Sequence, residues 1–182
     1  TNQSKGSTDQ FLDLTSKNYL IGHQSGKNLT SGLYNSFMGY QSGKATTEGS
    51  SNVFLGYQTG LNSTYANNDV FIGCQSGFNN YTGEINVFVG YKSGYSNIEG
   101  KSNVLIGNVA GFSNQTGYYN VMIGDSAGYS PFNSFYNVFI GQGCGKNNSY
   151  GQKNTFIGFQ SGYNNTDGES NVFIGNVCGR NN

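Results

Sequence analysis

The segment Asn137-Val138-Phe139-Ile140-Gly141 recurs in closely similar form at a fixed interval through residues 18–182, and this recurrence indicates the fold. Counting from it in steps of 17 residues reaches an Asn, or in one case an Asp, every time. These equivalent positions are Asn18, Asn35, Asn52, Asp69, Asn86, Asn103, Asn120, Asn137, Asn154 and Asn171. Residues 18–182 therefore hold nine full repeats and a tenth of twelve residues. An unbroken period of this length is typical of a solenoid, in which each coil contacts only its neighbours.

Glycine marks the expected corners of the coil. With Asn as position 1, Gly occupies positions 5 and 9 in all ten repeats and position 15 in seven of nine. A Gly at a fixed phase indicates a positive φ or a close backbone approach. We therefore expect a strand at positions 1–4, a bend at positions 5–9, a second short strand at positions 10–12 and a closing turn. The predicted fold class is all-β, a parallel β-solenoid of ten 17-residue coils over residues 18–182, with residues 1–17 as a non-repeat segment or cap.

The composition excludes several classes of partner. Nine Lys and Arg balance nine Asp and Glu, and only 10% of the residues are charged. We expect no nucleic acid as a partner, because nothing would neutralise its phosphates. No apolar run approaches the ~18 residues of a membrane span, so no membrane insertion is expected. The polar start, residues 1–10, does not resemble a signal peptide.

The Asn at position 1 is expected to have a structural role. Stacked Asn side chains form hydrogen bonds along a column in cross-β assemblies. A ligand or metal ladder is the functional alternative, but the same residue recurs in every coil and not at one site. We therefore predict a hydrogen-bonded Asn ladder.

The repeat Asn-Val-Phe-Ile-Gly-x-Gln-Ser-Gly-Tyr-Asn-Asn-Thr-x-Gly-Glu-Ser resembles the head repeats of trimeric autotransporter adhesins of the YadA type. It is also similar to 17-residue repeats of bacterial surface and phage tail-fibre-like proteins. The likeness covers residues 18–182. It implies a left-handed β-roll, a parallel homotrimer, and a role as head or shaft of an extracellular, cell-surface or virion fibre. YadA-type repeats are shorter and have small residues where this chain has Phe, which implies a wider coil or a differently packed face.

No constellation for catalysis is found, and neither a cofactor nor a metal is expected. His23 is the only histidine, so a zinc site or a Ser–His–Asp triad lacks its parts. Cys144 and Cys178 share position 8 but lie two coils apart, beyond the reach of a disulfide, and Cys74 lies at position 6. We expect free thiols and a protein that is not an enzyme.

Position 10 offers a candidate ligand face. Four successive coils place an aromatic ring there, and rings at position 6 are expected to flank them across the bend. The candidate residues are Phe78, Tyr95, Phe112 and Tyr129 at position 10, with Tyr40, Tyr57, Tyr91 and Phe159 at position 6. Exposed rings beside amides can bind sugar faces, whereas rings that stack on one another only shield the strand edge. Both interpretations remain open from the sequence.

A homo-oligomer is expected, because both faces of the strand at positions 2–4 are apolar and one coil has only one inside. The resemblance favours a trimer with the position-3 column toward its axis. The residues of this predicted oligomer stripe are Phe37, Phe54, Phe71, Phe88, Phe139, Phe156 and Phe173.

The sequence thus predicts a non-enzymatic structural and adhesive rod. One alternative is a carbohydrate- or receptor-binding module that uses the aromatic ladder, with a host glycan or surface receptor as its partner. A further alternative is an ice-binding solenoid, which needs an unbroken rank of Thr. Position 13 holds Thr only at Thr30, Thr47, Thr64 and Thr166. N-glycosylation sequons, which arise from the repeat pattern, occur at Asn2, Asn28, Asn62, Asn80, Asn114, Asn147 and Asn164.

Overall fold

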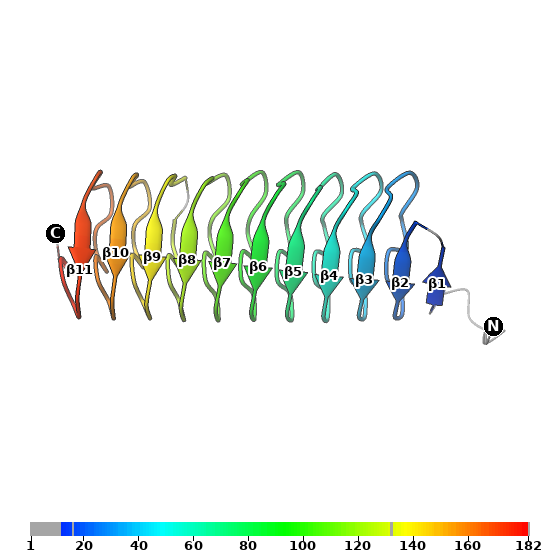
Figure 1. The fold of residues 1–182 in the computed structure, drawn as a ribbon, viewed down its shortest axis with the longest axis horizontal. Helices are drawn as coiled ribbons and strands as arrows, with labels where there is room; N and C mark the ends of the chain where they lie inside the picture. Colours follow the sequence, from blue (N-terminus) through cyan, green and yellow to red (C-terminus); the bar gives the residue numbers. More distant parts are fainter. Residues whose placement is uncertain (1–11, 16, 132, 182) are drawn as a thin grey trace.

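A computed structural model describes residues 12–15, 17–131 and 133–181 as a straight rod of stacked coils (Figure 1). Each coil contributes one three-residue strand, and no helix occurs in the described part of the chain. The strands are β1 (Leu12–Leu14), β2 (Tyr19–Ile21), β3 (Ser36–Met38), β4 (Val53–Leu55), β5 (Val70–Ile72), β6 (Val87–Val89), β7 (Val104–Ile106), β8 (Val121–Ile123), β9 (Val138–Ile140), β10 (Thr155–Ile157) and β11 (Val172–Ile174). The predicted all-β solenoid with a 17-residue period is confirmed.

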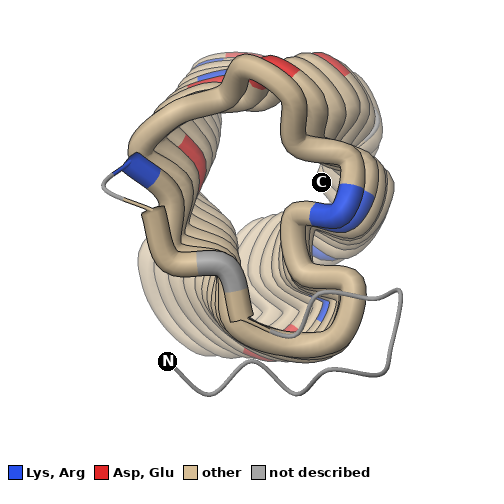
Figure 2. Tube along the Cα trace, turned by 90° about the vertical axis from the view of Figure 1, so that its right-hand side faces the viewer, with Lys and Arg blue, Asp and Glu red and all other residues tan. Residues whose placement is uncertain are grey.

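The strands form a single sheet in sequence order, β1 to β11. From β2 to β11 neighbours are parallel and in register, so that Phe54 pairs with Phe71 exactly one repeat later. Viewed along the rod, successive coils superimpose on one outline (Figure 2). At the N-terminal end β1 is antiparallel to β2, with Leu12 opposite Ile21. The described part of residues 1–17 thus covers the edge of the first coil, which would otherwise present unpaired backbone groups.

Inter-coil hydrogen bonds continue around the coil beyond the strands. The Gly77 N–H donates to the Ser93 carbonyl at 2.9 Å, and the Asn79 N–H donates to the Tyr95 carbonyl at 3.1 Å. The Asn80 N–H, however, bonds back to the Gly77 carbonyl of its own coil at 3.2 Å. Positions 10–12 therefore form a turn that is linked to the next coil, and the expected second strand is not present in the described coils.

The corners at position 5 have the geometry expected of glycine. Gly124 has φ +136°, and a Cβ built on it would lie 2.6 Å from the Gly141 carbonyl oxygen of the next coil. A side chain at this corner would therefore collide with backbone that cannot move aside. The corner assignment at position 5 is confirmed.

Two further corners, at positions 7 and 17, carry non-glycine residues with positive φ, which the sequence pattern did not reveal. Val109 at position 7 has φ +47° and Ile85 at position 17 has φ +60°. A positive φ is a genuine outlier for β-branched side chains, and it persists only where the surrounding structure imposes it. Here the Val109 N–H donates to the Tyr91 carbonyl of the preceding coil at 2.8 Å, as the stack requires.

The interior contains the position-3 column, which is the hydrophobic core of the rod. Its rings stack almost coplanar from coil to coil, with the Phe54 and Phe71 centroids 4.9 Å apart and an interplanar angle of 4°. The buried core residues of this column are Leu20, Phe37, Phe54, Phe71, Phe88, Leu105, Met122, Phe139 and Phe156, all but Leu20 fully inaccessible. Each ring packs over a position-9 glycine, as Phe88 does over Gly94.

The other side of the interior is polar, and the predicted Asn ladder is confirmed there. The backbone N–H of Asn52 donates to Asn35 Oδ1 at 3.0 Å, and Asn52 Nδ2 donates to the Ala66 carbonyl at 2.8 Å. The same pair of bonds recurs in neighbouring coils, for example at Asn103. Each buried amide therefore satisfies backbone groups both of its own coil and of the next coil.

A second buried Asn ladder, at position 12, accounts for the glycine at position 15 in the five coils that carry both residues. Asn114 Nδ2 donates to Asn97 Oδ1 at 3.1 Å and to the Gly117 carbonyl at 3.3 Å. A Cβ on the position-15 glycine would overlap the Asn Oδ1 of the same coil. The two coils that depart from Gly, at Ala66 and Ser134, are coils whose position 12 is not Asn.

Candidate functional site

The predicted ladder at position 10 is a real column of rings. The centroids of Phe78 and Tyr95 are 4.9 Å apart, and the Phe112 ring lies 5.2 Å from both Tyr95 and Tyr129. The interplanar angles do not exceed 15°, and all four side chains are half-buried. The structure therefore brings these predicted residues together on one side of the bend.

Stacking limits what this column can bind. A sugar packs its C–H groups against the face of a ring, but the inner faces of these four rings contact one another. Only the ring edges are left toward solvent. The geometry accordingly favours the shielding role of the position-10 column over the sugar-binding one.

The column continues beyond the aromatic residues through cations, which the sequence reasoning did not include in the site. The Lys146 ammonium lies 5.7 Å from the Tyr129 ring centroid and 5.5 Å from the Tyr163 centroid. The Arg180 guanidinium lies 5.5 Å from the Tyr163 ring. Such distances are typical of cation–π contacts, so Lys146 and Arg180 continue the column where it has no ring at position 10.

At position 6 the N-terminal rings also cover one another. Tyr40 stacks between His23, at 5.6 Å, and Tyr57, at 5.5 Å. The only histidine of the chain is thus part of an aromatic stack, as suits a structural role.

Near Tyr91, one lysine contacts a ring at position 6 and a ring at position 10. Lys92 Nζ lies 5.2 Å from the Tyr91 ring centroid and 5.4 Å from the Tyr95 centroid. A hydrogen bond with Tyr91 raises the pKa of Lys92, so the ammonium stays charged between the two rings. The coils on either side carry Cys74 and Asn108 at position 6, so no ring of this column stacks on Tyr91.

Phe159 is the second ring of this kind. It is 45% exposed, and Tyr91 is 49% exposed. The flanking residues at position 6 are Gln142 and Asn176, which carry amides. Of the predicted ligand face, Tyr91 and Phe159 are therefore the rings whose faces are best placed to contact a ligand.

The predicted oligomer stripe is the one part of the candidate site that needs correction. Phe37, Phe54, Phe71, Phe88, Phe139 and Phe156 are fully buried inside the coil of a single chain, and Phe173 is half-buried against this core. The coil closes on the side of position 3, because positions 1 and 3 point the same way and the Asn ladder lies inside. A prediction that the Phe column faces an oligomer axis is therefore wrong.

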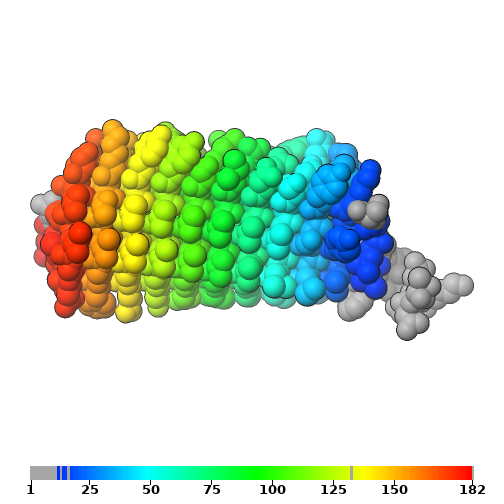
Figure 3. Space-filling view, in the orientation of Figure 1, coloured from blue at the N-terminus to red at the C-terminus, as the bar shows by residue number. Residues whose placement is uncertain are grey.

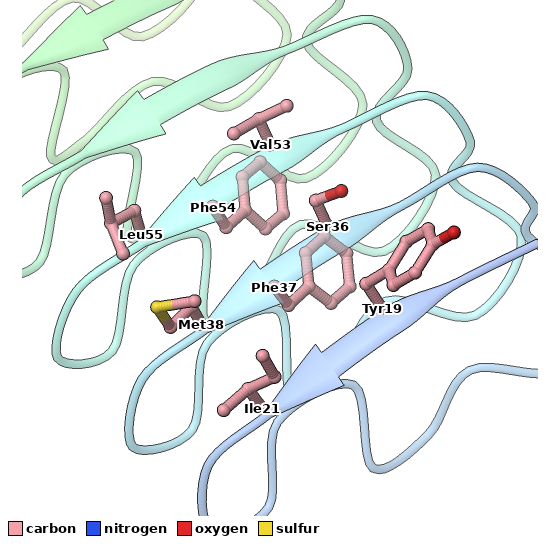
Figure 4. A pocket seen from close by; sticks show the side chains of 8 residues that line it. All are labelled: Tyr19, Ile21, Ser36, Phe37, Met38, Val53, Phe54 and Leu55. Carbon is pink, nitrogen blue, oxygen red and sulfur yellow. The ribbon is translucent and has the colours of Figure 1, made fainter. Parts of the chain in front are cut away.

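The apolar surface lies instead at positions 2 and 4, whose side chains form the outer face of β2 to β11, hereafter the strand face. No charged residue occupies these twenty positions. Side chains of three neighbouring strands line a shallow depression there, and Figure 4 shows those at positions 2 and 4 on the outer side of the ribbon, with the rings of Phe37 and Phe54 behind it. The lining residues are Tyr19, Ile21, Ser36, Phe37, Met38, Val53, Phe54 and Leu55.

Exposed aromatic and aliphatic side chains flank the strand face in many coils. Those at position 6 follow the corner glycine, and those at position 17 precede the buried Asn. The exposed large side chains at these two positions are Tyr34, Tyr40, Tyr57, Ile85, Tyr91, Tyr119, Tyr136 and Phe159. In the space-filling view the side chains form straight rows along the rod (Figure 3). The strand face and its flanks together hold most of the exposed large hydrophobic residues of the described chain.

An aromatic cluster at positions 16 and 17 was missed by the sequence reasoning. Tyr118 stacks on Phe135 at 4.6 Å, and Tyr119 stacks on Tyr136 at 5.2 Å. Tyr118 also meets Tyr136 edge to face. The signal was the pair of adjacent aromatic residues at the same phase of two successive repeats, which an analysis by single columns overlooks.

No cluster of metal-ligating side chains is found among the described residues. They contain no group of three or more His, Cys, Asp or Glu that could hold an ion, and no helix able to span a membrane. The three thiols are free, and burial raises the pKa of the Cys144 thiol to about 12, which keeps it protonated and unreactive. The rank at position 13 carries the exposed Tyr81 and Ile98 between its threonines, and Phe132 lies outside the described residues.

Comparisons of this chain with protein-family models, with curated proteins and with solved structures find no match.

Proposed function

We propose that this protein is a non-enzymatic structural rod that forms the head or shaft of a fibre on a cell surface or a virion, where it projects and adheres. The observation that supports this proposal most strongly is the uniformity of the stack. The coils repeat one hydrogen-bond pattern without an insertion. Such repetition produces a long and regular rod, in which no single coil is specialised. At one strand separation per coil the rod extends about 45 Å.

We propose further that the rod works as a homo-oligomer that is joined through the strand face. The face is about 45 Å long and 15 Å wide, which gives roughly 700 Å² from each copy, close to the ~800 Å² of a standard interface. An apolar centre, aromatic flanks and depletion of charge are the composition that protein interfaces share. The resemblance to adhesin repeats favours three copies in parallel.

The test uses paired substitutions of opposite charge in neighbouring coils, so that the added charges compensate each other. Val87→Lys with Val104→Glu places them on the strand face. Ile98→Lys with Gln115→Glu places the same charges on position 13 of the same two coils. Multi-angle light scattering of the full chain at micromolar concentration should show an oligomer for the wild type and for the position-13 pair, and a folded monomer for the strand-face pair. A wild type that is monomeric would contradict the association.

The rod proposal has a test of its own. Deletion of one whole repeat, residues 86–102, should leave a folded protein whose long dimension in small-angle X-ray scattering is shorter by about 5 Å, one strand separation. Deletion of nine residues from the same repeat should destroy the register and the fold. A whole-repeat deletion that unfolds the protein would show that the coils are not interchangeable units.

A second candidate function, glycan binding, is favoured by Tyr91 and Phe159, whose exposed rings have no aromatic neighbour at position 6 in the adjacent coils. Here the partner would be a host glycan or a glycosylated receptor. On a glycan array Tyr91→Ala with Phe159→Ala should abolish any signal of the wild type, whereas Phe112→Ala, inside the stacked column, should retain it. Loss of binding only in the Phe112 variant would assign the ligand to the position-10 column instead.

A further inference from the structure

The N-glycosylation sequons of this chain fall in two phases of the repeat, and the structure separates them. Where the Asn is at position 11, as in Asn28 and Asn164, its side chain is exposed. Where the Asn is at position 12, as in Asn80 and Asn114, it is fully buried in the second Asn ladder. Asn62 and Asn147, also at position 11, are half-buried, and Asn2 lies outside the described residues.

At the buried sequons both amide hydrogens are already used. Asn80 Nδ2 donates to Asp69 Oδ2 at 2.9 Å and to the Gly83 carbonyl at 3.0 Å. Asn114 Nδ2 donates to Asn97 Oδ1 and to the Gly117 carbonyl. Glycosylation would replace one of these N–H bonds by an N–C bond to the first sugar, while the lipid pyrophosphate carrier leaves and the proton passes to the transferase.

A glycan at these positions is incompatible with the stack. The amide lies between one coil and the next, where even a Cβ on the adjacent glycine has no room. In a glycosylating secretory compartment the transferase meets Asn-Tyr-Thr and Asn-Gln-Thr before the chain has folded, and an attached glycan must stay at the protein surface. Modification of Asn80 or Asn114 would therefore prevent coils 4 and 6 from closing.

We infer that this chain folds in a compartment without N-glycosylation, and that its buried sequons act as a barrier to folding in the secretory pathway of a glycosylating cell. The compartment in which the rod folds does not depend on whether the rod later serves as part of a fibre. Folding in such a compartment is compatible with the three free thiols. One of them, Cys144, is buried and donates a hydrogen bond to the Phe156 carbonyl.

The experiment compares the full chain made in a bacterial cytosol with the same chain secreted from yeast behind a signal peptide. The bacterial protein should show a β-type circular dichroism spectrum and a cooperative melt. The yeast protein should be retained in the cell, with glycans on Asn80 and Asn114 in peptide mass spectrometry.

Two paired variants make the test specific. Thr82→Ala with Thr116→Ala removes the buried sequons but keeps both asparagines, and it should restore secretion of folded rod by at least tenfold. Thr30→Ala with Thr166→Ala removes the exposed sequons at Asn28 and Asn164 and should restore nothing. Secretion of folded wild type, or failure of the first pair to rescue secretion, would overturn the inference.

Discussion

The two faces of the strand column are both largely apolar in sequence, but one is buried and the other lies on the outside of the rod. Phe88 is fully buried, whereas its neighbours Val87 and Val89 face outward and are half-exposed. The inner face is held by a stack of rings and two Asn ladders, so every inner side chain is fixed by the coils above and below. The side chains of the outer face are only partly covered by other residues of the same chain. One column therefore determines stability, and the other is available for association.

The corners that separate these faces should be the most sensitive positions. Gly107→Val should cost about 4 kcal/mol or more, because φ is +140° and the new Cβ would overlap the Gly124 carbonyl. Gly143→Val is the matched control, since Gly143 also has a positive φ but meets no atom closer than 3.4 Å, and other coils carry Val109 and Val177 at this position. Urea denaturation of both variants measures the difference. Equal costs would contradict the corner assignment.

Shortening a side chain on the inner or on the outer face of one strand should have very different effects on stability. Phe88→Ala should destabilise the rod by about 3–5 kcal/mol, because it removes a ring from the middle of a continuous stack. Val87→Ala should cost about 1 kcal/mol or less, because this side chain is outward and only partly covered. Thermal unfolding of the two variants, at a concentration where both are in the same oligomeric state, gives the answer. A larger effect at Val87 would reverse the inside and outside of the coil.

Asp69 tests the inner polar ladder through its charge. Elsewhere the position-1 amide donates to the position-15 carbonyl, as Asn86 does to Gly100 at 2.9 Å, but an ionised Asp has no proton to donate. Burial raises the pKa of Asp69 well above its usual value, and the Glu84 carboxylate adds to this rise. The folded state therefore favours the protonated form, and the associated stability is present at low pH and is lost as pH rises through the raised pKa.

Asp69→Asn should consequently stabilise the protein at pH 7 by about 1–3 kcal/mol, because a neutral amide replaces a buried carboxylate. The gain should shrink as the pH falls below the raised pKa, because protonated Asp69 can donate as Asn does. Melting temperatures of both proteins from pH 3 to pH 8 measure this difference. A gain that does not depend on pH would exclude the ionisation of Asp69 as its cause.

The smallest expected effect comes from the interruption of the second ladder at coil 7. Pro131 stands where the next Asn would donate, and the buried Asn114 Oδ1 has no hydrogen-bond partner. Pro131→Asn alone should gain nothing, because the Cβ of Ser134 occupies the space of the new Oδ1. Pro131→Asn combined with Ser134→Gly should gain about 1 kcal/mol, so a double-mutant cycle should show favourable coupling. Additive effects would mean that positions 12 and 15 are independent.

Much of this architecture could be predicted from residue spacing. The period, the parallel stack, the position-5 corners and the first Asn ladder follow from residues that recur at a fixed phase. The positive φ at Val109 and Ile85 could not be predicted, because local preference opposes it and only the bonds to adjacent coils impose it. The absence of a second strand has the same origin, since the turn bond from Asn80 to Gly77 is a matter of backbone geometry and not of residue type.

For the candidate site, spacing placed the aromatic residues in columns but could not say which surface of each ring is available. Stacking distance decides this, and it separates Phe112, covered on both faces, from Tyr91. The sequence did contain one unused signal about the strand. Position 2 accepts Tyr19, Ser36 and Thr155, whereas position 3 is apolar in every coil.

Residue spacing alone established that the chain is a solenoid of 17-residue coils with an apolar strand, because glycine and Asn recur at one fixed period over nine full repeats and a tenth of twelve residues. Which side of that strand faces the interior is known only from the folded coil. Alternation along a strand sets positions 2 and 4 apart from position 3, but the direction in which the coil closes depends on the glycine corners and on where the Asn amides find their carbonyl partners. That closure buries the Phe column and leaves the strand face on the outside of the rod.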